Sequence, residues 1–368
     1  MKSFAITAVD AWFFRDGRPY QEKEANQADV ISVFPPPART LSGALRAALA
    51  RANGWNGRGP WPDVLNGALG SGPDQLGGLQ FTGPFLISNG EALWPLPRHV
   101  LGRVEETWTP RAFLRPADAK TLCDAGEINL PIIALPPGEK RDGLKSAEAV
   151  WVTTTGLGAV LAGGLPKAEA VVDGKKLWAL EARVGLRRNE DTLTTGEGAL
   201  YSPSYVRLHR GVAIGVGVAG VPDDMAGLPE VFPLGGESRL ARRDAWSGET
   251  LPAPLPREKF SPDAAGRVEF TVVLLTPGRF TAPDLPAVEI VSACVGKPQF
   301  IGGWDSLKRA PLPLEPFAPV GSVWFCAARR ADFDAIHARH GQHLGPHAAH
   351  GFGQIVIGIW PPFRTQYL

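Results

Sequence analysis

Leucines recur at helical spacing along one short stretch near the N-terminus. In "SVFPPPARTLSGALRAAL" (32–49), apolar residues return every four positions from Leu41 to Leu49, and Asn53–Gly54 follows them. This spacing places the leucines on one helix face, and Asn and Gly tolerate the left-handed backbone that ends many helices. The pattern predicts a helix over about residues 38–53 that is entered through three consecutive prolines.

Strand-like runs bounded by Gly and Pro lie on both sides of this helix. Such runs predict strands at 3–14, 204–219, 267–276, 321–328 and 353–360. A compact helix is expected over 332–341, with Asp332 capping its start and Gly341 closing it. Strand, helix, glycine-rich turn and strand form the second half of a βαββαβ unit. We therefore predict an α+β protein with two ferredoxin-like (RRM-like) domains, the first with large loop and β-hairpin insertions.

A segment rich in Pro and Gly, 245–266, is the best candidate for a linker. It divides the chain into an N-terminal domain, 1–255, and a C-terminal domain, 256–368. The 43 glycines and 35 prolines among 368 residues predict many loops between short strands.

Charge, cysteines and hydropathy exclude several classes of protein. The net charge of +1 neither favours nor excludes a polyanionic partner, and three widely separated cysteines support no disulfide framework. The least polar stretch, 211–221, is about half as long as a membrane helix. These features predict a cytoplasmic protein that does not enter a membrane.

Negative charge is missing around the first helix. No carboxylate occurs from Val30 to Pro62, although this span contains Arg39, Arg46 and two further arginines. Free N–H groups at a helix start bind phosphate, and arginine adds bidentate pairing. An anion-binding surface is one interpretation, and a rigid lead-in to a packing helix is the other.

Two glycine motifs invite a ligand-binding interpretation. "GVGVAG" (215–220) matches the dinucleotide fingerprint, but prolines follow it where that motif needs a helix, so a closely packed strand is favoured. "GGESR" (235–239) suits phosphate capture by Ser238 and Arg239, or equally a tight turn before a strand. No cofactor is predicted.

Five of the seven histidines fall between His337 and His350. Imidazoles are metal ligands, but Gly and Pro interrupt any common helical face, and no Asp, Glu or Cys lies nearby to complete a site. No metal is predicted. Phosphate contact by His350, which stands beside "GFGQ", is favoured over a metal site.

In this order, eight segments resemble a known family: "DAWFFRDGRPY" (10–20), "SVFPPPARTLSGALR" (32–46), "VGLRRNEDTLTTGEGALYSPSYVRL" (184–208), "PLGGESRLA" (233–241), "LLTPGRF" (274–280), "GGWD" (302–305), "GSVWF" (321–325) and "GFGQIVIG" (351–358). Over nearly its full length the chain is similar to the third Cmr subunits of type III-B CRISPR effector complexes, within the RAMP superfamily. The C-terminal glycine-rich loop, "HGFGQ", is shorter than in many members.

The resemblance implies two ferredoxin-like domains and a non-catalytic, RNA-binding structural subunit. It implies that the protein holds the repeat-derived 5′ tag of the guide (CRISPR) RNA and bridges the large Palm-domain subunit to the backbone RAMP subunit. Cleavage and signalling chemistry would belong to those partners. The RNA-binding residues expected on this basis are Arg39, Thr40, Arg46, Arg187, Arg188, Ser238, Arg239, His350 and Gln354. Trp304 in "GGWD" is expected in the core or at a partner interface rather than under a stacked base.

Two other functions stay open. The chain could be a metal-independent endoribonuclease that matures guide RNA with His350 or Tyr201 as a catalytic group. It could also be a metalloenzyme built on the histidine-rich loop through His343 and His347.

Overall fold

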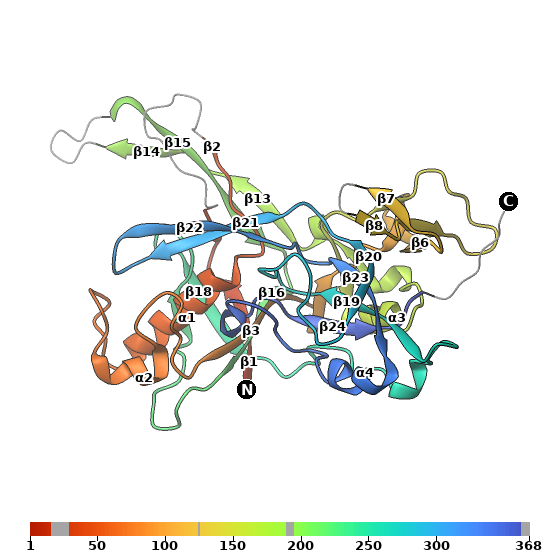
Figure 1. Ribbon diagram of the computed structural model, residues 1–368. Coiled ribbons are helices and arrows are strands. Elements are labelled where there is room, and N and C mark those ends of the chain that lie inside the picture. The colour runs from red at the N-terminus through yellow and green to blue at the C-terminus, as the bar shows by residue number, and fades with distance from the viewer. Residues whose placement is uncertain (16–28, 124–125, 189–194, 362–368) are drawn as a thin grey trace. The chain divides into compact units, whose positions relative to one another are not determined.

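The structure is a computed structural model that describes residues 1–15, 29–123, 126–188 and 195–361 (Figure 1). Strands make up most of its regular structure and helices are few, which confirms the predicted α+β class. Among the described residues, no helix combines the length and the apolar character needed to cross a bilayer.

The chain forms two compact units, each assembled from three segments. The first unit contains 1–89, 177–247 and 300–315, and the second contains 90–176, 248–299 and 316–368. The predicted boundary at 255/256 falls inside a segment of the second unit. Contacts define these units and do not test how the chain divides into folding domains, so the predicted domains stay a prediction.

The first unit is built on one antiparallel sheet. Its strands lie in the order β3-β16-β1-β18-β17, and β13, β14, β15 and β2 form a separate ribbon. Its helices and strands are β1 (Lys2–Ala8), β2 (Asp29–Val30), α1 (Ala38–Ala52), α2 (Asn66–Leu69), β3 (Gln80–Ser88), β13 (Trp178–Ala182), β14 (Gly185–Arg188), β15 (Thr195–Leu208), β16 (Val212–Ala219), β17 (Val231–Pro233), β18 (Leu240–Ala245), β21 (Gln299–Asp305) and β22 (Ala310–Phe317).

The glycines of "GVGVAG" lie in strand β16, which is buried along most of its length. A Cβ atom on Gly215 would lie 2.0 Å from the ring of Phe85 on the neighbouring strand β3. The small residues of this motif therefore make room for a ring inside the sheet. No helix starts at the end of the motif, as dinucleotide binding would need.

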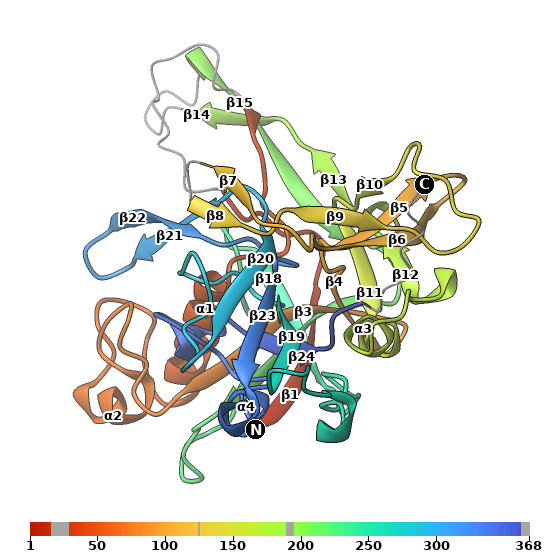
Figure 2. The same ribbon diagram turned by 45° about the vertical axis from the view of Figure 1, so that its right-hand side comes forward.

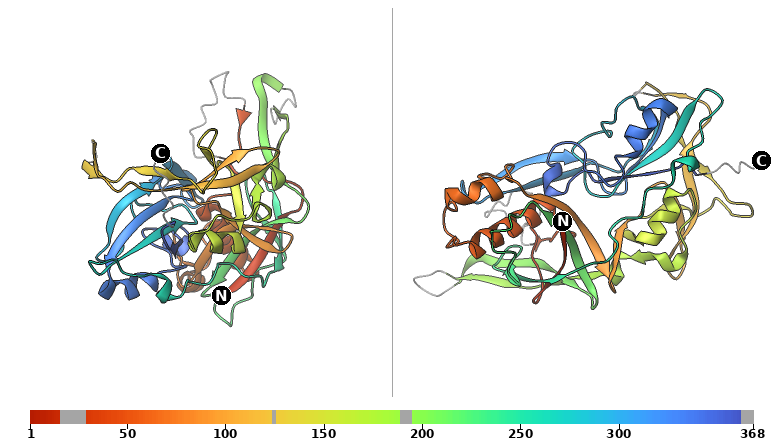
Figure 3. Two further views of the ribbon diagram at one scale, coloured as in Figure 1. Left: turned by 90° about the vertical axis from the view of Figure 1, so that its right-hand side faces the viewer. Right: turned by 90° about the horizontal axis from the view of Figure 1, so that it is seen from below.

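Helix α1 confirms the helix predicted from the leucine spacing. Leu41, Leu45 and Leu49 are all buried, and α1 contacts β3 and β17. Its first turn begins after Pro37 without a side-chain cap. Figure 3 shows α1 beside the segment that carries α2.

The lead-in to α1 is fixed by hydrogen bonds and rings. The backbone N–H of Phe14 donates to the Ser32 hydroxyl at 3.1 Å, and the Phe34 ring lies 5.0 Å from that of Trp178 and 6.4 Å from that of Phe14. The Phe34–Pro35 peptide bond is cis. This part of "SVFPPPAR" is thus held by internal packing.

The second unit contains the elements β4 (Glu91–Pro95), β5 (Val100–Val104), β6 (Trp108–Pro116), β7 (Thr121–Cys123), β8 (Gly126–Ile128), β9 (Pro131–Ala134), β10 (Lys145–Ser146), β11 (Val150–Thr153), α3 (Thr154–Leu161), β12 (Val171–Asp173), β19 (Arg267–Leu274), β20 (Glu289–Cys294), β23 (Val323–Arg329), α4 (Arg330–His337) and β24 (Ile355–Gly358). Strands β20, β23, β19 and β24 form an antiparallel sheet, with α4 directly after β23 (Figure 2). The predicted strands near 267, 321 and 353 are all present here.

Apolar side chains join α4 to this sheet. Phe270, Trp324 and Ile357 from the strands share a buried cluster with Phe333 and Ile336 of α4. The helix begins two residues before the predicted Asp332, whose carboxylate accepts a hydrogen bond from Arg329 Nε at 2.8 Å. Burial of this helix face, more than its end residues, sets where α4 lies.

Candidate functional site

The glycine turn at 235–239 lies against the segment that follows β1. The Gly236 N–H donates to the Phe13 carbonyl at 2.8 Å. A Cβ atom on Gly235 would lie 2.8 Å from that carbonyl oxygen, and one on Gly236 would lie 2.8 Å from the Phe13 ring. The two glycines are therefore required by the close approach of the turn to Phe13. They place Glu237 and Ser238, both in left-handed conformation, at the surface.

Two arginines lie over the ring of Tyr205 of β15. The guanidinium carbon of Arg239 is 4.3 Å from the centre of its ring, and that of Arg183 is 4.8 Å away. The Tyr205 hydroxyl donates a hydrogen bond to Glu237. Cation–π attraction and this bond hold the ring and both guanidinium groups in fixed positions.

Two further carboxylates complete the arrangement. Asp10 accepts hydrogen bonds from Arg183 and Arg207, each at 2.9 Å, and lies 3.5 Å from Arg239. Glu181 accepts from Arg183 at 2.7 Å and from Arg207 at 2.5 Å. We call these residues the Tyr205 cluster: Asp10, Glu181, Arg183, Tyr205, Arg207, Glu237 and Arg239. Its three arginines balance its three carboxylates.

The arginines of the cluster stabilise the charged forms of the Asp10 and Glu181 carboxylates. Hydrogen bonding to Arg183 is the main cause of the lowered pKa of Asp10. Hydrogen bonding to Arg207 is the main cause of the lowered pKa of Glu181.

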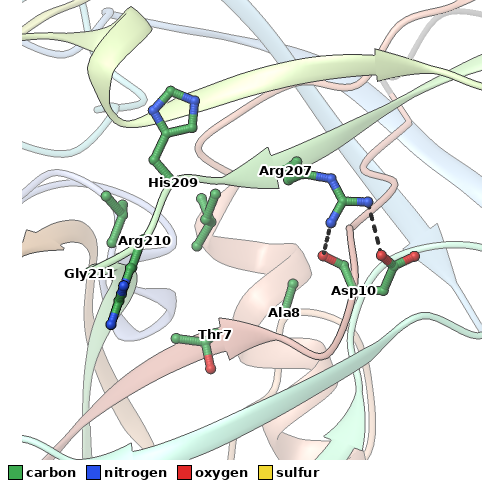
Figure 4. A pocket seen from close by; sticks show the side chains of 9 residues that line it. Thr7, Ala8, Asp10, Arg207, His209, Arg210 and Gly211 are labelled. Atoms are coloured by element: carbon green, nitrogen blue, oxygen red, sulfur yellow. Dashed lines mark hydrogen bonds and ion pairs between the residues drawn. The ribbon is translucent and has the colours of Figure 1, made fainter.

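A pocket of about 270 Å³ opens beside the cluster. Figure 4 shows the Asp10–Arg207 ion pair on one side of it, with His209 and Arg210 on the other. Both His209 and Arg210 are exposed, and Thr7 adds a hydroxyl group to the lining. A concave surface with cations and a hydroxyl can bind a phosphate or a ribose.

Acid is expected to destabilise the protein through the Tyr205 cluster. The folded-state pKa values of Asp10 and Glu181 are lowered, so their stabilising effect is complete above the unfolded-state values of about 4. It is lost as the pH falls through the lower folded-state values. Urea unfolding measured from about pH 6 down to about pH 3 should show this loss.

The same measurements on the double variant Asp10→Asn, Glu181→Gln provide the comparison. This variant should be less stable than the wild type near neutral pH, and the difference should shrink toward low pH. An acid dependence identical to that of the wild type would show that other carboxylates are responsible.

Arg39 is buried in the first unit, close to two carboxylates. It is only 8% exposed, and its guanidinium lies 2.8 Å from Asp74 and 3.8 Å from Glu315, all within the first unit. The carboxylates missing from 30–62 are thus supplied by other parts of the chain. Thr40 is half-buried on the same helix.

Arg46 is more deeply buried, at 4% exposed. It donates to the carbonyl oxygens of Leu69, Gly72 and Gln75 at 2.7, 2.9 and 2.8 Å, and its guanidinium carbon lies 5.1 Å from the centre of the Trp61 ring. Burial lowers the pKa of this guanidinium to about 10. The RNA contacts predicted for Arg39 and Arg46 stay untested, but both side chains already have internal roles.

The other predicted site residues are distributed over both units. Ser238 and Arg239 lie in the glycine turn, and Arg239 belongs to the Tyr205 cluster. Arg187 and Arg188 are on β14, and their side chains, like that of Tyr201, lie outside the described part of the structure.

His350 and Gln354 lie in the second unit, and both are buried. Gln354 donates to the Gly341 carbonyl at 3.2 Å. A Cβ atom on Gly353 would lie 2.1 Å from the Leu344 carbonyl oxygen, so this glycine serves an internal close approach. Phosphate contact by the loop stays a prediction, and the burial of both side chains does not favour it.

The histidine-rich segment is engaged with the backbone. His340 Nδ1 accepts from the Ile357 N–H at 3.1 Å, and His343 Nδ1 lies 3.0 Å from the Phe352 carbonyl oxygen. Burial lowers the pKa of both imidazoles. These rings therefore form hydrogen bonds with the backbone in and just before the last strand.

Sequence reasoning did not identify Asp10, Glu181, Arg183, Tyr205 and Arg207. Asp10, Arg183 and Tyr205 lie in or beside the motifs that carried the resemblance, "DAWFF" and "VGLRR…SYVRL". The charged and aromatic residues within those motifs were a signal that the sequence offers. The sequence does not show which of these residues pair with one another.

Comparison with known proteins identifies the family of this chain. The family model of the CRISPR-associated protein (Cas_Cmr3) matches residues 4–360. No curated protein matches the chain.

A solved structure shares the fold. A chain in "Cryo-EM structure of the Type III-B Cmr-beta bound to cognate target RNA and AMPPnP, state 1" is 17% identical with a TM-score of 0.50, over 92% of this chain and 89% of that chain. A chain in "Cryo-EM structure of the Type III-B Cmr-beta bound to cognate target RNA" gives 17% identity and a TM-score of 0.46, over 92% of this chain and 89% of that chain. "Crystal structure of Csm3-Csm4 subcomplex in the type III-A CRISPR-Cas interference complex" gives 11% and 0.37, over 98% and 100%. Since the family model spans nearly the whole sequence, this protein belongs to the Cas_Cmr3 family of CRISPR-associated proteins.

Proposed function

We propose that this protein is a non-catalytic RNA-binding subunit of a type III-B CRISPR (Cmr) effector complex. In that complex it holds the 5′ tag of the guide RNA and bridges the large Palm-domain subunit to the backbone subunit. Membership of the Cas_Cmr3 family supports this role. The similar structure described as a Type III-B Cmr-beta bound to cognate target RNA supports it as well.

We also propose that each unit contains a ferredoxin-like sheet. Numbered in chain order, β1, β3, β16 and β18 lie in the order 2-3-1-4, and so do β19, β20, β23 and β24. All neighbours in both sheets are antiparallel. A helix follows the first strand in one sheet (α1) and the third strand in the other (α4), as the βαββαβ order requires.

One observation carries the RNA-binding assignment: the Tyr205 cluster fixes three guanidinium groups on one surface of the first unit, beside a pocket that Arg210 also lines. Single-stranded RNA is recognised by phosphate and 2′-hydroxyl contacts and by bases held in pockets. Because the carboxylates of the cluster are matched by its own arginines, Arg210 gives the pocket its excess positive charge, and the His209 ring adds a hydrogen-bonding group. Ser238, exposed on the glycine turn, adds a hydroxyl donor.

The test is guide-RNA binding by the assembled complex. Arg239→Ala should weaken binding of a tagged guide about tenfold, because one charge-assisted contact and the orientation of Tyr205 are lost together. Fluorescence anisotropy with a tagged and a tagless guide measures the affinity and the preference for the tag. Arg242→Ala is the matched control, since Arg242 is exposed on β18, directly after the glycine turn that carries Arg239, and is paired with Glu230 at 3.6 Å.

Two results would contradict the proposal. Equal affinities for tagged and tagless guides would remove the role in tag binding. Specific cleavage of repeat RNA by the purified protein without metal, abolished by His350→Ala, would show that the protein is an endoribonuclease.

A further inference from the structure

The β21–β22 hairpin presents large apolar side chains to solvent. Phe300 is 66% exposed, Trp304 is 60% exposed, and Leu314 on the opposite strand is 42% exposed. Side chains alternate along a strand, so Phe300 and Trp304 share one face of β21, while Ile301 and Asp305 on the other face are buried. Trp304 therefore does not lie in the core.

Gly302 and Leu314 lie in the space between the two rings. Gly302 stands midway between them, and a Cβ atom there would lie 3.1 Å from a methyl carbon of Leu314. Leu314 thus covers the glycine from the neighbouring strand. Four residues of strand separate the rings by roughly 13 Å, which leaves room for one flat group on each.

The inner face of the hairpin is anchored within the first unit. A Cβ atom on Gly303 would lie 3.0 Å from Cδ of Arg39, so the Arg39 stem lies directly against this glycine. The Arg39 guanidinium is 3.8 Å from Glu315 of β22. The strand that carries the outward rings is consequently held in place, which reduces the entropy lost when a ligand binds.

Positive charge lies at the tip of the same hairpin. Lys308 and Arg309 form no ion pair within the described part of the chain. Both carboxylates of the hairpin are engaged: Asp305 accepts from the N–H groups of Leu307 and Lys308 at 3.0 and 3.1 Å, and Glu315 lies beside Arg39. The exposed surface therefore combines rings with cations.

We propose that the outer face of this hairpin binds single-stranded RNA. Trp304 and Phe300 each stack on a base, while Lys308 and Arg309 pair with the phosphates that follow. This inference rests on the proposed RNA-binding function and adds a second RNA-binding element to it. Proteins that bind single strands combine stacking rings with a cationic track in this way. Both carboxylates of the hairpin are engaged internally, so its exposed tip carries two unopposed cations, and this charge matches the phosphates of RNA better than a protein surface of mixed charge.

Binding of a short fluorescein-labelled oligoadenylate to the full-length chain tests the inference. Trp304→Ala should raise the Kd about tenfold, and Trp304→Phe should keep most of the affinity. Replacing Lys308 and Arg309 with alanine should reduce the salt slope of binding by about 0.7 for each lost phosphate contact. Leu122→Ala is the matched control, because Leu122 is 79% exposed on another two-stranded hairpin, β7–β8.

The outcomes separate this inference from the proposed function. Wild-type oligoadenylate affinity in Trp304→Ala, with an unchanged melting temperature, would overturn the RNA role of the hairpin. If the same variant instead failed to co-purify with the large subunit, the face would be a protein interface. The hairpin variants could behave as expected while the assembled complex bound tagged and tagless guides with equal affinity. In that case the proposed tag binding would be wrong and the hairpin inference would stand.

Discussion

Replacing Arg46 with alanine is expected to lower the free energy of unfolding by about 4 kcal/mol. This arginine closes the segment 69–75 onto helix α1 by donating to three backbone carbonyls. Without it, those carbonyls lose their charged donor, and the Trp61 ring loses the cation packed over it. Urea unfolding of the full chain measures the change.

Arg46→Lys should rescue little of this loss, since one ammonium group does not reproduce the fork that reaches three carbonyls. The matched control is Arg51→Ala, on the same helix but exposed, with an expected loss below about 1 kcal/mol. Similar losses in both variants would mean that the removal of a positive charge from α1, and not the buried hydrogen bonds, explains the effect.

Arg39→Glu is expected to cost about 3 kcal/mol and to loosen the β21–β22 hairpin. The new carboxylate would face Asp74 and Glu315, which the guanidinium now attracts at 2.8 and 3.8 Å. We place the cost at the low end for a broken buried pair because Asp74 is about half exposed, so that solvent screens part of the repulsion. Unfolding by urea measures the loss, and proteolysis of the folded protein reports whether the hairpin opens.

Arg39→Met separates the charge from the packing. Methionine keeps an apolar stem against Gly303 and removes the attraction, so the loss should be clearly smaller than for Arg39→Glu. If Arg39→Glu instead left stability unchanged and only weakened guide binding, Arg39 would be an RNA contact as the sequence suggested.

Local patterns predicted the elements whose residues are neighbours in sequence. The leucine spacing predicted α1 because three leucines on one face need a core wherever the helix packs. The strands near 267, 321 and 353 followed from apolar runs that end at Gly or Pro. Residues 9–14 were misjudged as strand, since Asp10 leaves the sheet after β1 and Trp12 pairs with Val206 of β15 instead.

The site depended on contacts between distant residues. Asp10 meets Arg183, Arg207 and Arg239, which stand 173, 197 and 229 positions further along the chain. No periodicity records such a pairing. The same reason explains Arg39, whose surroundings lack acidic residues in sequence but contain two in space. Its motif allowed an anion-binding surface or a rigid lead-in to a packing helix, and the sequence could not show the internal ion pairs that Arg39 forms.

The division of the chain has a consequence for synthesis. Six segments alternate between the two units, so the polypeptide crosses from one to the other five times. Segment 300–315 completes the first unit. The sheet of the first unit therefore lacks the β21–β22 hairpin until most of the chain has left the ribosome. Nascent chains shorter than this expose Arg39 without Glu315. Each unit is made of three separate segments, so neither can be produced as one contiguous fragment.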